Sequence, residues 1–209
     1  MIDMDDQPIS ATFFDEGRWL SSFVTPNALE VEELHKELTK DLRGGLEPRL
    51  AALHQWVATR VKYKRFISGR IVIEGRSSIQ NDLWNNPSIT ARIGVGNCAN
   101  KAFLLASLIR KELPPNQVYV VLGNLYNGKA SGHAWVQVQL GESEYIIEST
   151  QASVKTLIPT YTTNRYEAVH LFNDQQAYFI EGKTVMQPFS ACYSTWLRDY
   201  LDMAYINSR

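Results

Sequence analysis

The chain has 209 residues, of which 44% are hydrophobic and 21% are charged, and its net charge is −1. This composition is typical of a folded globular protein and excludes an intrinsically disordered chain. The balanced charge provides no overall field that would favour nucleic acid or anionic membranes. We therefore expect neither nucleic acid nor a membrane among the partners.

The cysteine content and the apolar runs bear on the cellular compartment. Two cysteines occur, Cys98 and Cys192, which is too few for a disulfide scaffold and favours a reducing environment. No apolar stretch approaches the roughly 18 residues of a membrane span. The acidic residues 1–6 are not followed by the apolar run of a secretory signal. These features predict a cytoplasmic location.

One local cluster of positive charge stands out. It lies between residues 60 and 76 and consists of Arg60, Lys62, Lys64, Arg65, Arg70 and Arg76. Long basic side chains in such runs most often form a solvated face. A solvated face is therefore the favoured interpretation, and a site for acidic groups of a substrate is the alternative.

Two amphipathic helices are predicted in the first part of the chain. The first follows Pro26 and ends at Gly44-Gly45, with an apolar stripe of Val31, Leu34, Leu38 and Leu42. The second begins at Pro48, which the first turn tolerates because its missing N–H would be unpaired there. Its core-facing stripe is Leu50, Leu53, Val57 and Val61. Residues 70–73 are predicted as a short strand, and residues 81–90 as a loop because they contain Pro87 and several Asn.

The third helix carries the clearest pattern, from Cys98 to Leu113. Asn97 is a good N-cap, and Pro114-Pro115 ends the helix. The apolar positions follow helical spacing at Ala102, Leu105, Ala106, Ile109 and Leu113.

The rest of the chain predicts mainly strands. We expect strands at 118–122, 133–140 and 145–149, with a tight hairpin turn at Gly141-Glu142 and a flexible loop at 127–132. A further hairpin is predicted from 177–180 and 184–187, before a final helix at 191–206. Helices followed by antiparallel strands indicate an α+β fold. No repeat or linker divides the chain, so we expect a single domain over residues 1–209.

Cys98 is the first candidate catalytic residue. Gly94 and Gly96 lead the chain to a helix N-terminus, where unpaired N–H groups and the helix dipole favour a thiolate. The thiolate is the nucleophilic form of cysteine. The alternative for a lone cysteine is a small buried apolar residue.

A nucleophilic thiol needs a base, and the base needs a group that orients it. His35 and His54 lie on predicted helices, and His170 lies in a region without clear periodicity. His133 begins a strand on which Trp135 and Gln137 share its face.

The predicted hairpin supplies a carboxylate. With Gly141 and Glu142 as the turn, Leu140 pairs with Ser143 and Trp135 pairs with Glu148. Glu148 then lies diagonally across from His133 on the same face, within reach of a long side chain. The cysteine at a helix start, the histidine on a strand and the carboxylate across the hairpin together predict Cys98, His133 and Glu148 as a catalytic triad.

Three segments resemble transglutaminase-like domains. The run Gly94-Val95-Gly96-Asn97-Cys98-Ala99-Asn100-Lys101-Ala102 resembles their nucleophile segment, Gly132-His133-Ala134-Trp135-Val136-Gln137-Val138 their histidine strand, and Tyr145-Ile146-Ile147-Glu148-Ser149-Thr150 the segment with their acidic residue. The similarity covers residues 47–150, with elaborations at both ends. Asn97 and Glu148 stand where the family commonly has Asp.

The resemblance implies a papain-like core, in which the nucleophile helix packs on an antiparallel sheet that carries base and acid. It also implies attack of Cys98 on an amide carbonyl, protonation of the leaving amine by His133, and a thioester intermediate. The oxyanion would be held by the Cys98 N–H and one side-chain donor, for which Gln80 and Trp84 are the candidates. No cofactor is implied, and the expected partner is a peptide or protein amide substrate.

Three functions remain open on this basis. A hydrolytic cysteine enzyme, meaning a peptidase, amidase or deamidase, is favoured. An acyltransferase that passes the thioester to an amine is the alternative. An acceptor tunnel lined by aromatic residues would favour it, and the C-terminal part contains several, although a core or lid position is the favoured interpretation for them: Tyr161, Tyr166, Phe172, Tyr178 and Phe179. A binding module without activity is the third. A metal site is not expected, because no CxxC or HxxxH pair occurs.

Overall fold

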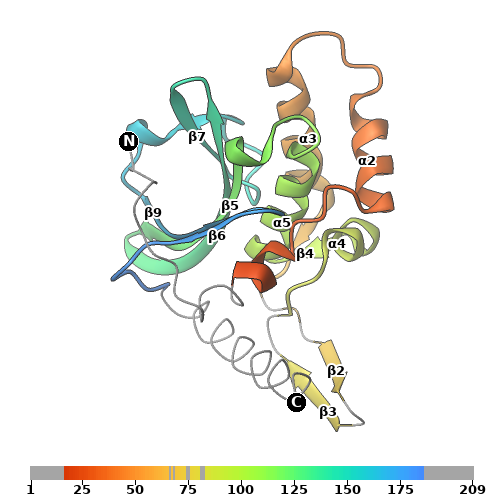
Figure 1. Cartoon of the computed structure of the whole chain (residues 1–209), viewed down its shortest axis with the longest axis vertical. Helices are drawn as coiled ribbons and strands as arrows, with labels where there is room; N and C mark the ends of the chain where they lie inside the picture. Colours follow the sequence, from red (N-terminus) through yellow and green to blue (C-terminus); the bar gives the residue numbers. More distant parts are fainter. Residues whose placement is uncertain (1–16, 66, 68, 74–75, 81–82, 186–209) are drawn as a thin grey trace.

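A group of helices lies beside a six-stranded antiparallel sheet in the computed structural model of the chain (Figure 1). The structure describes residues 17–65, 67, 69–73, 76–80 and 83–185, without the side chains of 69–73 and 76–80. Residues 17–21 are helical. The longer helices are α2 (Leu29–Thr39), α3 (Leu46–Arg60), α4 (Pro87–Ile93) and α5 (Cys98–Ile109).

The main sheet has the strand order β10-β9-β5-β6-β7-β8. Its strands are β5 (Val118–Asn127), β6 (Lys129–Leu140), β7 (Ser143–Ile147), β8 (Ile158–Pro159), β9 (Tyr166–Phe172) and β10 (Ala177–Phe179). Two short pairs lie outside it: β1 (Lys62–Tyr63) with β4 (Val95–Gly96), and β2 (Gly69–Ile73) with β3 (Arg76–Gln80). The predicted α+β class is confirmed.

Helix α5 is the centre of the core. Each of its residues is buried, and it packs on β5 and β6. Alternation along these strands divides the side chains into two clusters. One belongs to the core around α5 and contains Val118, Val120, Leu122, Ala134, Val136 and Val138. The other lies on the opposite face and contains Tyr119, Val121, Trp135, Ile146 and Leu171.

The predicted helices are largely confirmed. All four residues of the α3 stripe are buried, and Pro48 lies in the first turn. Helix α2 ends at Thr39, before the last residue of its predicted stripe, and α5 ends at Ile109, where the chain tightens into turns before Pro114.

The prediction of a loop over residues 81–90 was wrong in its second half. Pro87 is the first residue of α4, which runs to Ile93 and ends at Gly94 with a positive φ of 62°. Proline fixes φ at a helical value and needs no N–H partner at this position, so it starts a helix here instead of interrupting one.

The flexible loop predicted at 127–132 was also wrong. Strands β5 and β6 pair continuously from Val118 with Val138 to Asn127 with Lys129. Gly128, with φ of 77°, makes the turn. The small and polar residues before His133 therefore extend β6, so His133 lies within a strand instead of at its beginning.

The C-terminal part contributes to the main sheet. His170, expected in an irregular region, lies on β9, which pairs with β5. Residues 177–179 form the expected strand, but β10 pairs with β9 instead of with residues 184 and 185. The second half of the predicted hairpin at 186–187, the predicted helix at 191–206 and Cys192 lie outside the described residues.

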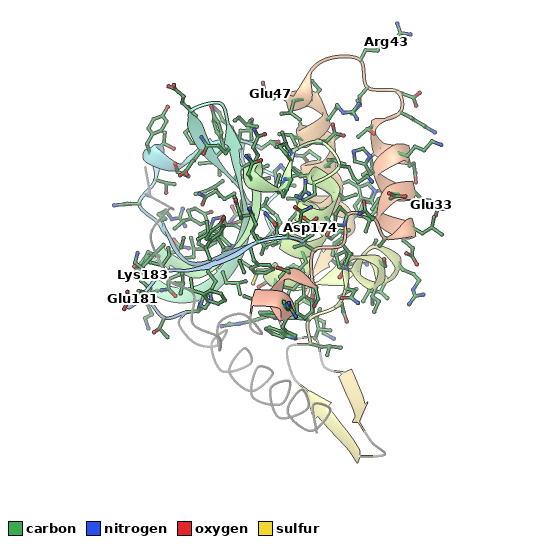
Figure 2. The ribbon with its side chains drawn as sticks, in the orientation of Figure 1. Glu33, Arg43, Glu47, Asp174, Glu181 and Lys183 are labelled. Carbon is green, nitrogen blue, oxygen red and sulfur yellow. The ribbon has the colours of Figure 1, made fainter. Side chains whose placement is uncertain are left out.

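Several charged side chains project from the periphery of the molecule. Figure 2 shows Glu33, Arg43 and Glu47 projecting from α2, α3 and their connection, and Glu181 with Lys183 at the far side of the sheet. Within the basic cluster, Arg60, Lys62, Lys64 and Arg65 are exposed, as a solvated face requires. Among the described residues, no helix is long and apolar enough to cross a membrane.

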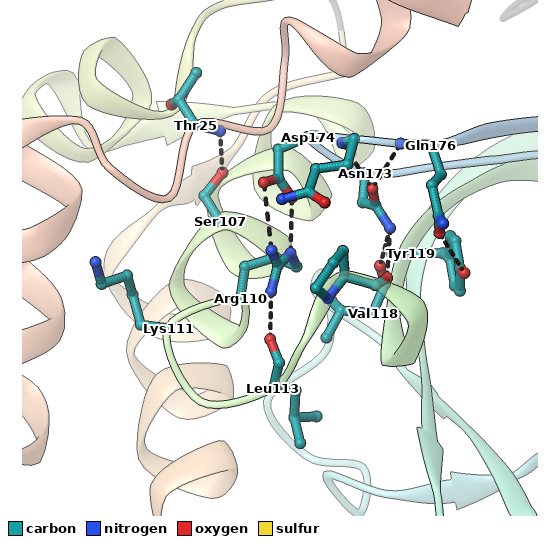
Figure 3. A network of polar contacts seen from close by, with 12 residues as sticks. Thr25, Ser107, Arg110, Lys111, Leu113, Val118, Tyr119, Asn173, Asp174 and Gln176 are labelled. Carbon is teal, nitrogen blue, oxygen red and sulfur yellow. Dashed lines mark hydrogen bonds and ion pairs between the residues drawn. The ribbon is translucent and has the colours of Figure 1, made fainter.

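A polar network fixes the C-terminal end of α5 (Figure 3). Arg110 Nε and Nη2 donate to the two carboxylate oxygens of Asp174 over 2.7 and 3.3 Å. The neighbouring Asn173 donates from its Nδ2 to the Val118 carbonyl oxygen over 3.0 Å. Because these contacts join the end of α5 to the β9–β10 turn and to the start of β5, they set how the helix lies along the sheet.

Gly123 permits the close packing of β5, β6 and β9. It pairs with His133, and a Cβ at this position would lie 2.1 Å from the Glu167 carbonyl oxygen and 2.6 Å from the Trp135 ring.

We expect Gly123→Ala to lower the free energy of unfolding by about 3 kcal/mol, because the backbone must shift. Urea denaturation measures this. Gly45→Ala, which meets no atom within 4 Å, should cost less than about 1 kcal/mol; similar losses for both would contradict the steric argument.

Candidate active site

Cys98 occupies the first position of α5. Asn97 is the N-cap, and its side-chain oxygen accepts the Asn100 N–H over 3.0 Å, as predicted. The Cys98 N–H is a first-turn donor for which the helix has no carbonyl partner. The thiol is 7% exposed and forms no disulfide. A thiol at this end of a helix lies close to the first-turn N–H groups.

His133 joins the thiol to a carboxylate. Its Nε2 lies 2.8 Å from Glu148 Oε2, and the Cys98 side chain is near enough to raise the pKa of His133. Because Nε2 donates to the carboxylate, Nδ1 is the nitrogen left for the thiol. The structure therefore brings the three residues singled out by the sequence into one connected set.

The hairpin register brings His133 and Glu148 together as predicted. Leu140 pairs with Ser143 across the Gly141 turn, and the ladder continues to Val136 with Ile147. The next step in this register places Glu148 opposite Trp135. Strand β7 ends at Ile147, two residues earlier than predicted, so Glu148 follows the strand directly.

Glu148 is completely buried and has donors on both carboxylate oxygens. Oε1 accepts the Thr150 N–H over 3.0 Å and the Thr150 hydroxyl over 2.6 Å. Oε2 accepts from His133 and from the Tyr166 hydroxyl over 3.1 Å. Such a site stabilises an anion, because each contact is a donor.

The pKa values of the pair move apart. Burial raises the pKa of Glu148, but the hydrogen bonds and charge of His133, together with Thr150, outweigh it and lower the pKa to about 2. Burial lowers the pKa of His133, but the neighbouring Cys98 and Glu148 side chains raise it to about 10. Glu148 is therefore ionised and the imidazolium is favoured near neutral pH.

His54 holds the backbone of the acidic residue. It is fully buried on α3, and its Nε2 lies 3.0 Å from the Glu148 carbonyl oxygen and 3.2 Å from that of Gln151. Both neighbours are acceptors, so Nε2 carries the proton. Burial lowers the pKa of His54, which keeps the ring neutral. The sequence indicated a helical histidine but gave no signal for this contact.

Lys101 and Asn100, in the first turn of α5 after Cys98, have structural roles. Lys101 is buried, and its Nζ donates to the carbonyl oxygens of Ala58 and Val61 over 3.1 and 2.7 Å, which caps α3. Burial is the largest influence on the pKa of Lys101 and lowers it to about 8. Asn100 accepts the Asn85 N–H over 2.8 Å and donates to the Leu83 carbonyl oxygen over 3.2 Å.

These contacts fix the segment that carries Trp84, one of the two oxyanion candidates. The Trp84 ring packs in an aromatic cluster with Trp19, Phe23 and Phe103, at centroid distances of 5.2 to 5.4 Å. Gln80 ends β3, and its side chain lies outside the described part of the chain. A role for either residue as oxyanion donor remains a prediction.

Two other acidic residues that could replace Glu148 in such a triad, Asp174 and Glu144, lie elsewhere. Asp174 is paired with Arg110 at the opposite end of α5 from Cys98. Glu144 is exposed on β7. Across the described residues, no group of three or more His, Cys, Asp or Glu side chains could hold a metal ion.

Comparisons with known proteins support the fold. No protein-family model matches the chain, and no curated protein matches its sequence. Among solved structures, EGTA-treated LapG from Legionella pneumophila has a TM-score of 0.50 at 13% identity, over 82% of this chain and 97% of LapG. A second LapG structure gives the same score over 83% of this chain. A candidate cysteine protease from Cytophaga hutchinsonii has a TM-score of 0.46 at 15% identity, over 79% of this chain and 56% of that protein.

LapG has the fold of the transglutaminase-like cysteine proteases. The packing of α5 on an antiparallel sheet is therefore the fold that the resemblance in the sequence implied, similar to that of transglutaminase-like cysteine proteases. At this level of identity the likeness concerns the fold.

Proposed function

We propose that this chain is a cysteine-nucleophile amide hydrolase of the peptidase, amidase or deamidase kind, with Cys98, His133 and Glu148 as its triad. The observation that carries the proposal is the position of His133, whose Nε2 lies 2.8 Å from Glu148 Oε2 and whose pKa is raised by the neighbouring Cys98 side chain. The likeness in fold to a cysteine protease supports a peptide or protein substrate.

The mechanism follows from these positions. The Cys98 sulfur attacks the amide carbonyl carbon, and the oxyanion that forms is stabilised by the Cys98 N–H at the start of α5. The imidazolium of His133 gives its proton to the amine as the C–N bond breaks, which leaves a thioester and a neutral imidazole. His133 then removes a proton from water, which attacks the thioester and releases the acid. Glu148 keeps Nε2 protonated and stabilises the imidazolium in each cycle.

Two other functions are compatible with this fold. An acyltransferase would use an amine in place of water to attack the same thioester. A binding module would have no turnover. Burial of the Glu148 carboxylate costs free energy even with its four donors, and a module without catalysis has no need of a buried carboxylate beside His133. We favour hydrolysis over both.

Mass spectrometry of the protein mixed with a peptide library tests the proposal. We expect cleaved peptides or glutamine side chains that gain about 1 Da by deamidation, and neither with Cys98→Ser. Cross-linked peptides in place of these products would establish the acyltransferase, because an amine then replaces water as acceptor. No product of any kind would favour the binding module.

Cys98 should also react faster than Cys192 with iodoacetamide at about pH 6 to 7, because the helix N-terminus and His133 favour its thiolate. Peptide mapping of the labelled native protein measures both rates. His133→Ala should remove the preference. Equal labelling of the two cysteines in the native protein would contradict an activated thiol at Cys98.

A further inference from the structure

Tyr166 contacts the carboxylate that orients His133. Its hydroxyl donates to Glu148 Oε2 over 3.1 Å, and this is the oxygen that His133 Nε2 contacts at 2.8 Å. Tyr166 begins β9, 18 residues after Glu148, and pairs with Leu125 on β5. The phenol is therefore supplied by a strand outside the three segments that resemble transglutaminase-like domains.

The ring of Tyr166 is held in place by its neighbours. It packs edge-on against Trp135 at a centroid distance of 5.1 Å and lies 6.5 Å from the His133 ring. Trp135 in turn stacks beside His133 at 6.3 Å. Aromatic packing of this kind restricts the phenol to a narrow range of orientations, and in this range it points at the carboxylate.

The phenol can act only as a donor to Glu148. Burial, and then the negative charge of Glu148, raise the pKa of Tyr166, so the hydroxyl stays protonated wherever the triad could work. A hydrogen bond to the charged form of an acid stabilises that form. It also limits rotation of the carboxylate, whose terminal torsion is otherwise broad.

The two oxygens of Glu148 are thus held from different parts of the chain. Thr150 fixes Oε1 through its N–H and hydroxyl. Within the described part of the chain, Oε2 of Glu148 has two donors, His133 and Tyr166, so loss of the Tyr166 hydroxyl would leave it with His133. The plane of the carboxylate would then be set from one side only.

We infer that Tyr166 is a positioning residue of the proposed triad, which holds Glu148 ionised and turned so that Oε2 receives the His133 Nε2–H. The inference rests on the proposed function. It makes the acid part of the site a unit of Glu148, Thr150 and Tyr166.

The test is Tyr166→Phe, which keeps the ring and removes the hydroxyl. We expect kcat to fall on the order of tenfold with KM little changed, because the lost hydrogen bond orients the base and does not contact the substrate. The acid limb of the pH profile should move to higher pH, because a carboxylate with one donor fewer protonates more readily.

Tyr119→Phe is the matched control. Tyr119 belongs to the same aromatic cluster, and its hydroxyl donates to Gln176 Oε1 over 3.0 Å instead of to Glu148. Tyr119→Phe should leave kcat within about twofold of wild type and the acid limb of the pH profile at the same pH, because its hydroxyl contacts no member of the triad.

A double-mutant cycle separates positioning from packing. If Tyr166 acts through Glu148, Tyr166→Phe should change kcat less than about twofold in the Glu148→Gln background. An equal loss in both backgrounds, or wild-type turnover in Tyr166→Phe, would overturn the inference.

Failure of the proposed function can be distinguished from failure of this inference. In that case the wild-type protein would give no product, and iodoacetamide would label both of its cysteines equally. In that event the inference is still decided by the nitrogen NMR signals of His133. Tyr166→Phe should shift the acid-side titration step of this ring to higher pH, and an unchanged step would overturn it.

Discussion

Replacing His133 with alanine should lower kcat by about 10²- to 10⁴-fold, the usual contribution of a general acid and base. The variant loses the group that protonates the leaving amine and that favours the thiolate of Cys98. The fold should persist, because Glu148 keeps its contacts with Thr150 and Tyr166. Steady-state rates and circular dichroism measure the two quantities.

Gln137→Ala is the control for this change. Gln137 lies on β6 and shares the face of His133, but it pairs with Ile146, away from Glu148. It should retain wild-type kcat, since it contacts no member of the proposed triad. If His133→Ala unfolds while Gln137→Ala remains folded, the histidine has a structural role and the catalytic assignment fails.

Glu148→Gln should lower kcat by about 10- to 10³-fold, which corresponds to roughly 1.4 to 4 kcal/mol in the barrier. The reason is the ring of donors around this side chain. A glutamine NH₂ group placed at Oε2 would face the His133 Nε2–H and favour the wrong tautomer. Placed at Oε1, it would face the Thr150 N–H. Either orientation leaves a buried donor without an acceptor, so we also expect a loss of about 1 to 3 kcal/mol in the free energy of unfolding.

Glu148→Asp should be less harmful to turnover, because it keeps the charge and supplies the acid that is usual in the transglutaminase-like domains that the sequence resembles. The comparison is kcat of wild type and the two variants at temperatures where all are folded. Wild-type turnover in Glu148→Gln would remove Glu148 from the triad.

The pH dependence of stability gives a second reading of the same variant. The pKa of Glu148 falls from 4.5 to about 2 on folding, so its contribution is present above about pH 4.5 and is lost as the pH falls through 2. The pKa of His133 rises from 6.5 to about 10, so its contribution is present below 6.5 and is lost as the pH rises through 10. The stability gap between wild type and Glu148→Gln should therefore be largest between these limits, at about pH 4.5 to 6.5.

Denaturant titrations across this range measure the gap. Glu144→Gln, at an exposed position of β7, should show no maximum there, because an exposed carboxylate gains little on folding. A gap for Glu148→Gln that does not vary with pH would contradict the ionised pair.

The features that the sequence determined by itself are those with a local physical cause. Helical periodicity identified the buried stripe of α3 and most of α5, and the Asn97 side chain had a first-turn N–H within reach. The Gly141 turn set the pairing of Leu140 with Ser143. Because side chains alternate with a period of two, this one turn placed His133 and Glu148 on the same face.

Other local patterns were ambiguous, and tertiary structure decided them. Pro87 is compatible with a loop or with the first turn of a helix, and packing of α4 against α5 and α2 selected the helix. Ser131 and Gly132 have weak strand propensity, yet pairing with β5 extends β6 through both residues. The neighbouring strand thus overrode the local preference.

The contacts around Glu148 were decided by tertiary structure alone. Tyr166 reaches the carboxylate because β9 pairs with β5, and His54 reaches the Glu148 carbonyl oxygen from a helix 94 residues earlier in the chain. Pairings over such separations depend on loop-closure entropy and on the burial gained across the whole sheet. A local sequence pattern carries no information on these two opposing contributions. The sequence could therefore identify the catalytic candidates but not the residues that hold them in place.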